Sequence, residues 1–209
     1  MDRRPLAAAL AVVFGLIAVV CCLVAVPARA GPLHEAARAG DAEAAAALLA
    51  AGGDIEDRSL TEETPLIAAA LAGQRAVAEL LLDRGADIGA RNDRGLTALH
   101  AAAYGGHAEL VALLIARGAA VDDADNRFRA TPLHTAAEED HDAVVGLLIE
   151  AGANVEAAEA GGFTPLTRAF WKGSSASIER LIAAGATCQP AEVTGDPALF
   201  QTCTGRVSQ

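Results

Sequence analysis

The sequence predicts an all-α protein, a solenoid of about five similar helix–turn–helix units. Two periodic features support this prediction. A threonine recurs at intervals of 33, 34 and 33 residues: Thr64, Thr97, Thr131 and Thr164. A glycine recurs in the same register: Gly52, Gly85, Gly118, Gly152 and Gly185. A period of this length is typical of repeat architectures in which each unit stacks on its neighbours.

Each unit contains two short phrases that predict its two helices. The first phrase is GPLHEAARAGD, TPLIAAALAGQ, TALHAAAYGGH, TPLHTAAEEDH and TPLTRAFWKGS in turn. The second is LLAAG, LLDRG, LIARG, LIEAG and LIAAG. Threonine caps a helix, proline fits its first turn, and glycine lets the chain reverse after the second helix. The predicted units lie near residues 31–63, 64–96, 97–130, 131–163 and 164–187.

These phrases resemble the ankyrin repeat, whose unit combines T-P-L-H-x-A-A, a G-H step, an L-L-x-x-G-A close and a hairpin finger. The resemblance implies an ankyrin-repeat domain over residues 31–187. It also implies a concave face, formed by fingers and inner helices, that binds another protein. Alanine occupies one position in every unit, as close contact between stacked inner helices requires: Ala36, Ala69, Ala102, Ala136 and Ala169.

Residues 1–30 predict a signal peptide or an N-terminal membrane anchor. Two arginines precede an apolar run from Pro5 to Val26, and the small-x-small motif Ala28-Arg29-Ala30 follows it. The run has 22 residues. That is longer than the roughly 7 to 15 of a signal core and enough to span a bilayer uncleaved. The charge bias around the run places the remainder outside the cytoplasm. The signal and the Ala and Arg bias favour a bacterial source.

Composition limits the partner classes. The formal net charge is -11, and residues 31–209 carry 13 basic and 26 acidic side chains, a net charge of -13. No basic patch of the kind that tracks a phosphate backbone is evident, so we expect no nucleic-acid partner. We expect a protein partner with a basic or mixed surface. The membrane is a partner only through residues 1–30, if these are uncleaved.

One segment suggests a metal or catalytic site. On a continuous helix His134, Glu138 and His141 would share one face. However, His134 is the histidine of the T-P-L-H phrase and His141 that of the G-H step, and a turn between two helices separates them. The same two positions hold histidine in other units: His34, His100 and His107. We therefore interpret these histidines as scaffold, and expect no metal, no cofactor and no catalytic residues.

The family resemblance places variable contact positions on the fingers and just before each G-H step. Two residues directly precede each G-H step, and the chain's only tyrosine and only tryptophan both occupy the first of those two positions. Such residues are enriched at interface hot spots. We predict six partner-binding residues: Tyr104, Trp171, Phe163, Arg94, Glu138 and Glu139. The alternative for Trp171 is that it packs, with Phe170, under the C-terminal tail as a cap of the last unit.

Residues 188–209 form a predicted tail with proline and glycine at intervals. The tail holds Cys188 and Cys203, the two cysteines outside residues 1–30. An even pair in an exported chain favours a disulfide, and two free thiols are the alternative.

The favoured function is that of a non-enzymatic protein-interaction scaffold, periplasmic or secreted. A membrane-anchored ankyrin regulator of a neighbouring membrane protein is the alternative. A metal-dependent enzyme is the least favoured interpretation.

Overall fold

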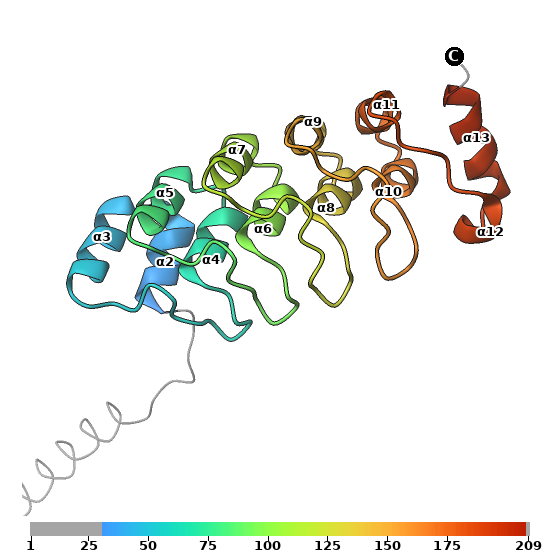
Figure 1. Ribbon diagram of the computed structural model, residues 1–209. Coiled ribbons are helices and arrows are strands. Elements are labelled where there is room, and N and C mark those ends of the chain that lie inside the picture. The colour runs from blue at the N-terminus through green and yellow to red at the C-terminus, as the bar shows by residue number, and fades with distance from the viewer. Residues whose placement is uncertain (1–30, 208–209) are drawn as a thin grey trace, which may run out of the picture.

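Two layers of short helices run along the length of the molecule (Figure 1). The computed structural model describes residues 31–207, and the predicted signal peptide or anchor lies outside this range. The inner layer contains α2 (Pro32–Ala39), α4 (Pro65–Leu71), α6 (Ala98–Tyr104), α8 (Pro132–Glu138) and α10 (Pro165–Lys172). The outer layer contains α3 (Ala42–Ala50), α5 (Arg75–Asp83), α7 (Ala108–Ala116), α9 (Asp142–Glu150) and α11 (Ser175–Ala183).

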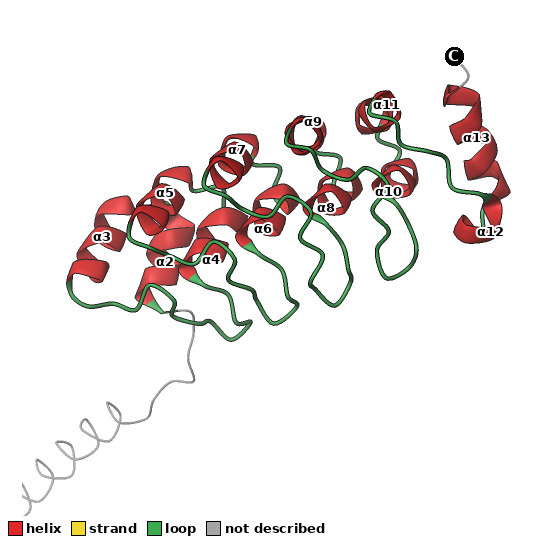
Figure 2. Ribbon diagram, viewed as in Figure 1, coloured by secondary structure: helices red, strands yellow, loops and turns green. Residues whose placement is uncertain are grey.

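The prediction of an all-α solenoid is confirmed. Residues 31–207 contain helices and loops but no strand (Figure 2). Each inner helix packs against the outer helix of its own unit and against the inner helices of adjacent units. Within this part of the chain, no helix combines the length and the apolar character needed to cross a bilayer.

Four long loops, the fingers, connect each outer helix to the next inner helix and project to one side of the helical layers (Figure 1). Their tips lie at residues 59–62, 92–95, 126–129 and 159–162, numbered here as fingers one to four. Each finger begins after a glycine with φ between 88° and 91°, a left-handed conformation that glycine adopts without strain: Gly52, Gly85, Gly118 and Gly152.

The threonines that set the period begin the inner helices. The hydroxyl of Thr64 accepts a hydrogen bond from the backbone N–H of Ile67 at 3.3 Å, and Thr131 accepts one from that of His134. Proline follows in the first turn, where no intrahelical donor is needed. A capping threonine of this kind stabilises a helix by roughly 1 kcal/mol.

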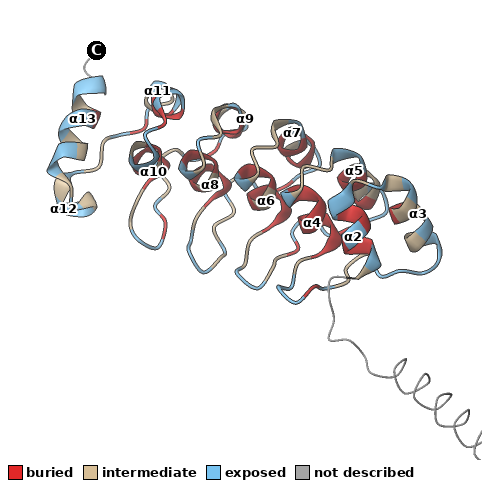
Figure 3. Cartoon of the chain, turned by 180° about the vertical axis from the view of Figure 1, so that it is seen from behind, coloured by how far each residue is buried: buried red, intermediate tan, exposed pale blue. Residues whose placement is uncertain are grey.

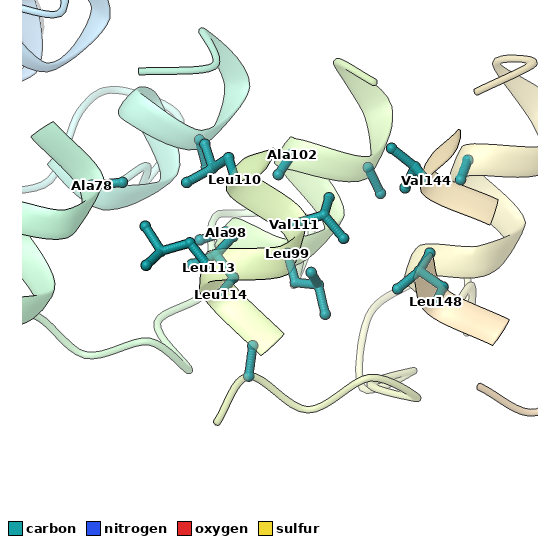
Figure 4. Close-up of a cluster of buried hydrophobic side chains, with 14 of the residues drawn as sticks. Ala78, Ala98, Leu99, Ala102, Leu110, Val111, Leu113, Leu114, Val144 and Leu148 are labelled. Carbon is teal, nitrogen blue, oxygen red and sulfur yellow. The ribbon is translucent and has the colours of Figure 1, made fainter. Parts of the chain in front are cut away.

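The core combines alanines and leucines of the inner layer with leucines, valines and isoleucine of the outer layer. Ala69, Ala102, Ala136 and Ala169 are wholly buried. Figure 4 shows leucine and valine side chains of α7 near Leu99 and Ala102 of α6, with Val144 and Leu148 of α9 in the same buried cluster. Burial is greatest in the middle units and falls towards the ends (Figure 3). The first outer helix, α3, buries only Ala45.

The tail contains two helices that the sequence analysis did not predict, α12 (Ala191–Thr194) and α13 (Pro197–Val207). Asp196 caps α13, because its carboxylate accepts hydrogen bonds from the N–H groups of Ala198 and Leu199 at 2.9 and 3.1 Å. Cys188 and Cys203 form a disulfide in the structure, with Cα atoms 5.8 Å apart. Cys203 is buried beside α10, so the tail covers the end of the stack.

Replacing Cys188 and Cys203 by alanine should let the tail helices α12 and α13 separate more readily from the last unit. The bridge joins residues 15 apart, and a loop of that length contributes about 3 kcal/mol in the chain-entropy model. We expect the amides of α12 and α13 to lose protection from hydrogen exchange, measured by mass spectrometry, while those of α4 to α9 keep theirs. Equal protection of the tail in both proteins would show that the bridge does not hold it.

Candidate functional site

The T-P-L-H histidines join each inner helix to the next finger. Their Nε2–H groups donate to backbone carbonyl oxygens: His34 to Glu63 at 2.8 Å, His100 to Ala130 at 3.0 Å and His134 to Phe163 at 3.0 Å. Each acceptor is the last residue before the next capping position. These bonds fix the fingers relative to the helices.

The second ring nitrogen is also used in two of these histidines. The backbone N–H of Thr97 donates to Nδ1 of His100 at 3.3 Å, and that of Thr131 to Nδ1 of His134 at 3.1 Å. Each ring thus accepts at Nδ1 and donates at Nε2, as a neutral imidazole does. Burial lowers the pKa of both rings, which agrees with the neutral form.

Residues at the G-H step form a second series of bonds, directed at the preceding unit. His107 Nε2–H donates to the carbonyl of Leu71 at 3.1 Å, and His141 Nε2–H to that of Tyr104 at 2.8 Å. In the second unit Gln74 donates to Arg38 at 3.2 Å in the same way. The series holds the backbone at the C-terminal ends of α2, α4 and α6, where the Arg38, Leu71 and Tyr104 side chains project outward.

These two series account for the apparent metal ligands. His134 bonds along the stack towards the fourth finger, and His141 bonds back to the third unit. Glu138 forms an ion pair with Arg168 at 3.2 Å. The three side chains therefore have separate partners, and residues 31–207 contain no group of three or more potential ligands placed to hold a metal ion.

The buried histidines predict a pH dependence of stability. Because the folded pKa of His100 and of His134 lies below the ordinary 6.5, the unfolded chain takes up their protons first. The free energy of unfolding should be highest above about pH 7 and fall as the pH drops through about 6.5, by up to about 1.4 kcal/mol per pH unit for each histidine.

Denaturant unfolding at a series of pH values measures this dependence. The matched control is the double variant His100→Ile and His134→Ile, because Ile67 occupies the equivalent position in the second unit. We expect a flatter profile for that variant. Profiles of equal slope would show that these histidines do not govern the dependence.

Large exposed hydrophobic side chains gather on one surface, called the inner surface here and defined by the finger tips and the exposed ends of the inner helices. Six such residues occur within residues 31–207: Leu60, Leu71, Tyr104, Phe128, Trp171 and Val193. The first five lie on the inner surface, and Val193 lies in the tail. Leu71, Tyr104 and Trp171 occupy the same repeat position in three units. The outer helices contribute none.

The six predicted partner-binding residues fall into two groups. Tyr104 and Arg94 belong to the first, which lines a groove of about 280 Å³ between the first two fingers and α4 and α6. Ile67, Leu71 and Leu96 also line this groove. Its walls are mainly apolar, and the Tyr104 side chain, 53% exposed, forms part of its rim.

The second group is organised by Arg168, which the sequence analysis did not select. Phe163 and Trp171 form an edge-to-face pair with ring centroids 4.6 Å apart. The Arg168 guanidinium lies 5.9 and 5.6 Å from their centroids and pairs with Glu138. Glu159, also paired with Arg168, is nearly buried. The arginine therefore holds an aromatic platform in place.

Neither predicted glutamate is free. Glu138 pairs with Arg168, and the Glu139 carboxylate lies 3.8 Å from the Lys172 ammonium. Each cation lies in the next unit, so its contact could not be derived from repeat spacing alone. Glu138 and Arg168 carry opposite charges on the inner helices of adjacent units, and this pattern in the sequence could have indicated the ion pair.

The tail contacts Phe170 rather than Trp171. Phe170 is partly buried against the core and shares a small cavity with Leu199, Phe200 and Cys203. Trp171 remains 44% exposed on the inner surface. The capping role considered for both aromatics thus fits Phe170.

The family model for ankyrin repeats (3 copies) matches residues 8–92, 87–159 and 122–192, which together exceed half of the chain. The chain belongs to the ankyrin-repeat family. Ankyrin repeats act as protein–protein interaction modules and are generally non-enzymatic. A protein is therefore the class of partner that the repeats indicate. No match was found among curated proteins.

Proposed function

We propose that this ankyrin-repeat protein is an exported scaffold that binds a partner protein through the inner surface. The observation that carries the proposal is the position of the exposed hydrophobic residues, five of six on that one surface. Apolar side chains clustered on a single face are typical of interaction sites, whereas scattered ones need no explanation.

Contacts within the protein hold two parts of the inner surface in place. The carbonyl of Tyr104 is fixed by His141, and the Trp171 ring is fixed by Phe163 and Arg168. Anchors held in place lose less conformational freedom on binding, and this favours affinity. Tyr104 and Trp171 are accordingly the expected hot spots, supported by Phe163, Arg94, Glu138 and Glu139.

Tyr104→Ala and Trp171→Ala should each weaken partner binding by about tenfold or more, equivalent to at least roughly 1.4 kcal/mol. The partner is first captured from the envelope fraction with the wild-type protein, and its affinity is then measured by calorimetry. Circular dichroism should show that both variants remain folded.

Val193→Ala is the matched control, because Val193 is as exposed as Trp171 but lies off the inner surface. Glu150→Ala tests the outer layer in the same way. Unchanged affinity in both aromatic variants, or a loss that follows unfolding, would refute the proposed binding surface.

Export is supported by residues 1–30 and by the point where the folded domain begins. Helix α2 starts at Pro32, directly after the small-x-small motif and Gly31. Cleavage after Ala30 would leave every repeat intact. The 22-residue apolar run supports the alternative, a membrane-anchored regulator of a neighbouring membrane protein.

The mature protein should begin at Gly31 and occur in the periplasm or outside the cell. Sequencing the N-terminus of the native protein tests this expectation, since cleavage after a small-x-small motif exposes the following residue. Native protein that retains residues 1–30 and sediments with the inner membrane would instead support the anchored form. Native protein that retains them in the cytosol would refute export.

A further inference from the structure

Positive charge remains unpaired in the fingers although acidic residues outnumber basic ones. Residues 31–207 hold 13 basic and 26 acidic side chains. Seven of the basic residues have a carboxylate within 4.0 Å: Arg38, Arg75, Arg91, Arg117, Arg168, Lys172 and Arg180. The remaining six have none among the described residues: Arg58, Arg84, Arg94, Arg127, Arg129 and Arg206. Four of these six lie in the fingers.

Three of the unpaired arginines belong to the adjacent tips of fingers two and three. The backbone N–H of Arg127 donates to the carbonyl of Arg94 at 3.1 Å, and the Arg127 guanidinium donates to the carbonyl of Asp93 at 3.2 Å. Residues 92–95 and 126–129 hold Arg94, Arg127, Arg129 and Asp93, a net charge of +2. Asp125, which directly precedes the third tip, lies 3.8 Å from Arg91. Phe128, 44% exposed, lies between two of these arginines in the sequence.

Arg129 occupies a backbone conformation that suits glycine better. Its φ is 52°, and the equivalent residues in fingers two and four are Gly95 and Gly162, with φ of 84° and 82°. A side chain in the left-handed region costs roughly 1 kcal/mol or more. In the first finger the position holds Glu62, with the opposite charge. Stability therefore does not account for an arginine in finger three.

The groove beside these tips is apolar and contains little competing negative charge. Arg94 lies at its edge, and Leu71 and Tyr104 form its wall. The one glutamate that lines it, Glu63, is neutralised by Arg38 at 2.8 Å. Asp93 is the remaining carboxylate there, beside Arg94 in the sequence. Arg94 thus lines a pocket sized for an apolar side chain, and Arg127 of finger three is joined to the same finger tip through the Asp93 carbonyl.

We propose that the tips of fingers two and three bind an acidic segment of a partner protein, with one bulky apolar side chain of that segment in the groove at Tyr104 and Leu71. The inference rests on the proposed function and specifies the chemistry of its partner. It differs from the expectation of a basic or mixed surface, which followed from net charge alone. Arginine pairs well with carboxylates because its planar fork can donate two parallel hydrogen bonds.

Selection from a displayed library of short random peptides tests this proposal on the purified protein. The enriched pool should be more acidic than the input and should contain an aromatic or large aliphatic residue. Its binding should weaken as the salt concentration rises, since exposed charges are screened. A pool with unchanged or positive net charge, or no enrichment at all, overturns the proposal, as does tighter binding of a single-stranded oligonucleotide at the same surface.

Charge-reversal variants locate the contact. The triple variant Arg94→Glu, Arg127→Glu and Arg129→Glu should bind the enriched peptides at least about tenfold more weakly. Arg84→Glu is the control, because Arg84 is exposed and unpaired but lies at the end of outer helix α5. Equal losses in both proteins would indicate a general charge effect and refute the assignment.

Arg129→Gly separates binding from stability. The variant should unfold at the same or a higher temperature, because glycine relieves the left-handed strain, yet bind the peptides several-fold more weakly. Unchanged peptide binding by this variant would show that Arg129 does not contact the peptide. If the enriched peptides are neutral or basic and their binding still weakens on Tyr104→Ala, the proposed function stands and only the acidic specificity is refuted.

Discussion

Close contact between the inner helices is the constraint on which this structure depends. Each of the three middle inner helices must approach two others, and an alanine at one repeat position allows it. A larger side chain there would force the stack apart at a cost of about 1–3 kcal/mol. Wholly buried Ala69, Ala102, Ala136 and Ala169 therefore set the spacing of the units. That spacing in turn brings the side chain at each G-H step within hydrogen-bonding distance of the preceding unit.

The sequence was sufficient to predict features that repeat. The 33-residue period, the capping threonines and the terminal glycines each occur in several copies, so the fold and the role of the histidines followed from comparing units. Features that occur once were harder to predict. Helix α13 was missed although Asp196 and Pro197 form a recognisable helix start. The separation of the six site residues into two groups depends on how Arg168 packs, and the sequence gives no direct measure of this packing.

Net charge describes the whole chain and does not by itself describe the inner surface. An overall excess of carboxylates describes the average surface, whereas recognition depends on which charges remain after intramolecular pairing. Glu138 and Glu139 are matched by cations of the next unit, while the arginines of fingers two and three are not. The finger tips therefore hold arginines without a carboxylate partner although the chain as a whole is acidic.

The C-terminal end of the stack is covered by the tail. Thr164 and Thr167 lack a following unit, and Gln189 of the tail takes its place. Its side-chain oxygen accepts from the Thr164 N–H at 3.0 Å and from the Thr167 hydroxyl at 2.6 Å, while its amide donates to Gly162 at 2.8 Å. An open solenoid end presents a heterologous surface on which a second molecule could stack, and such contacts propagate into filaments. The tail covers that surface at the C-terminal end, held by Gln189 and the disulfide, so a second molecule would have to displace α12 and α13 to stack there.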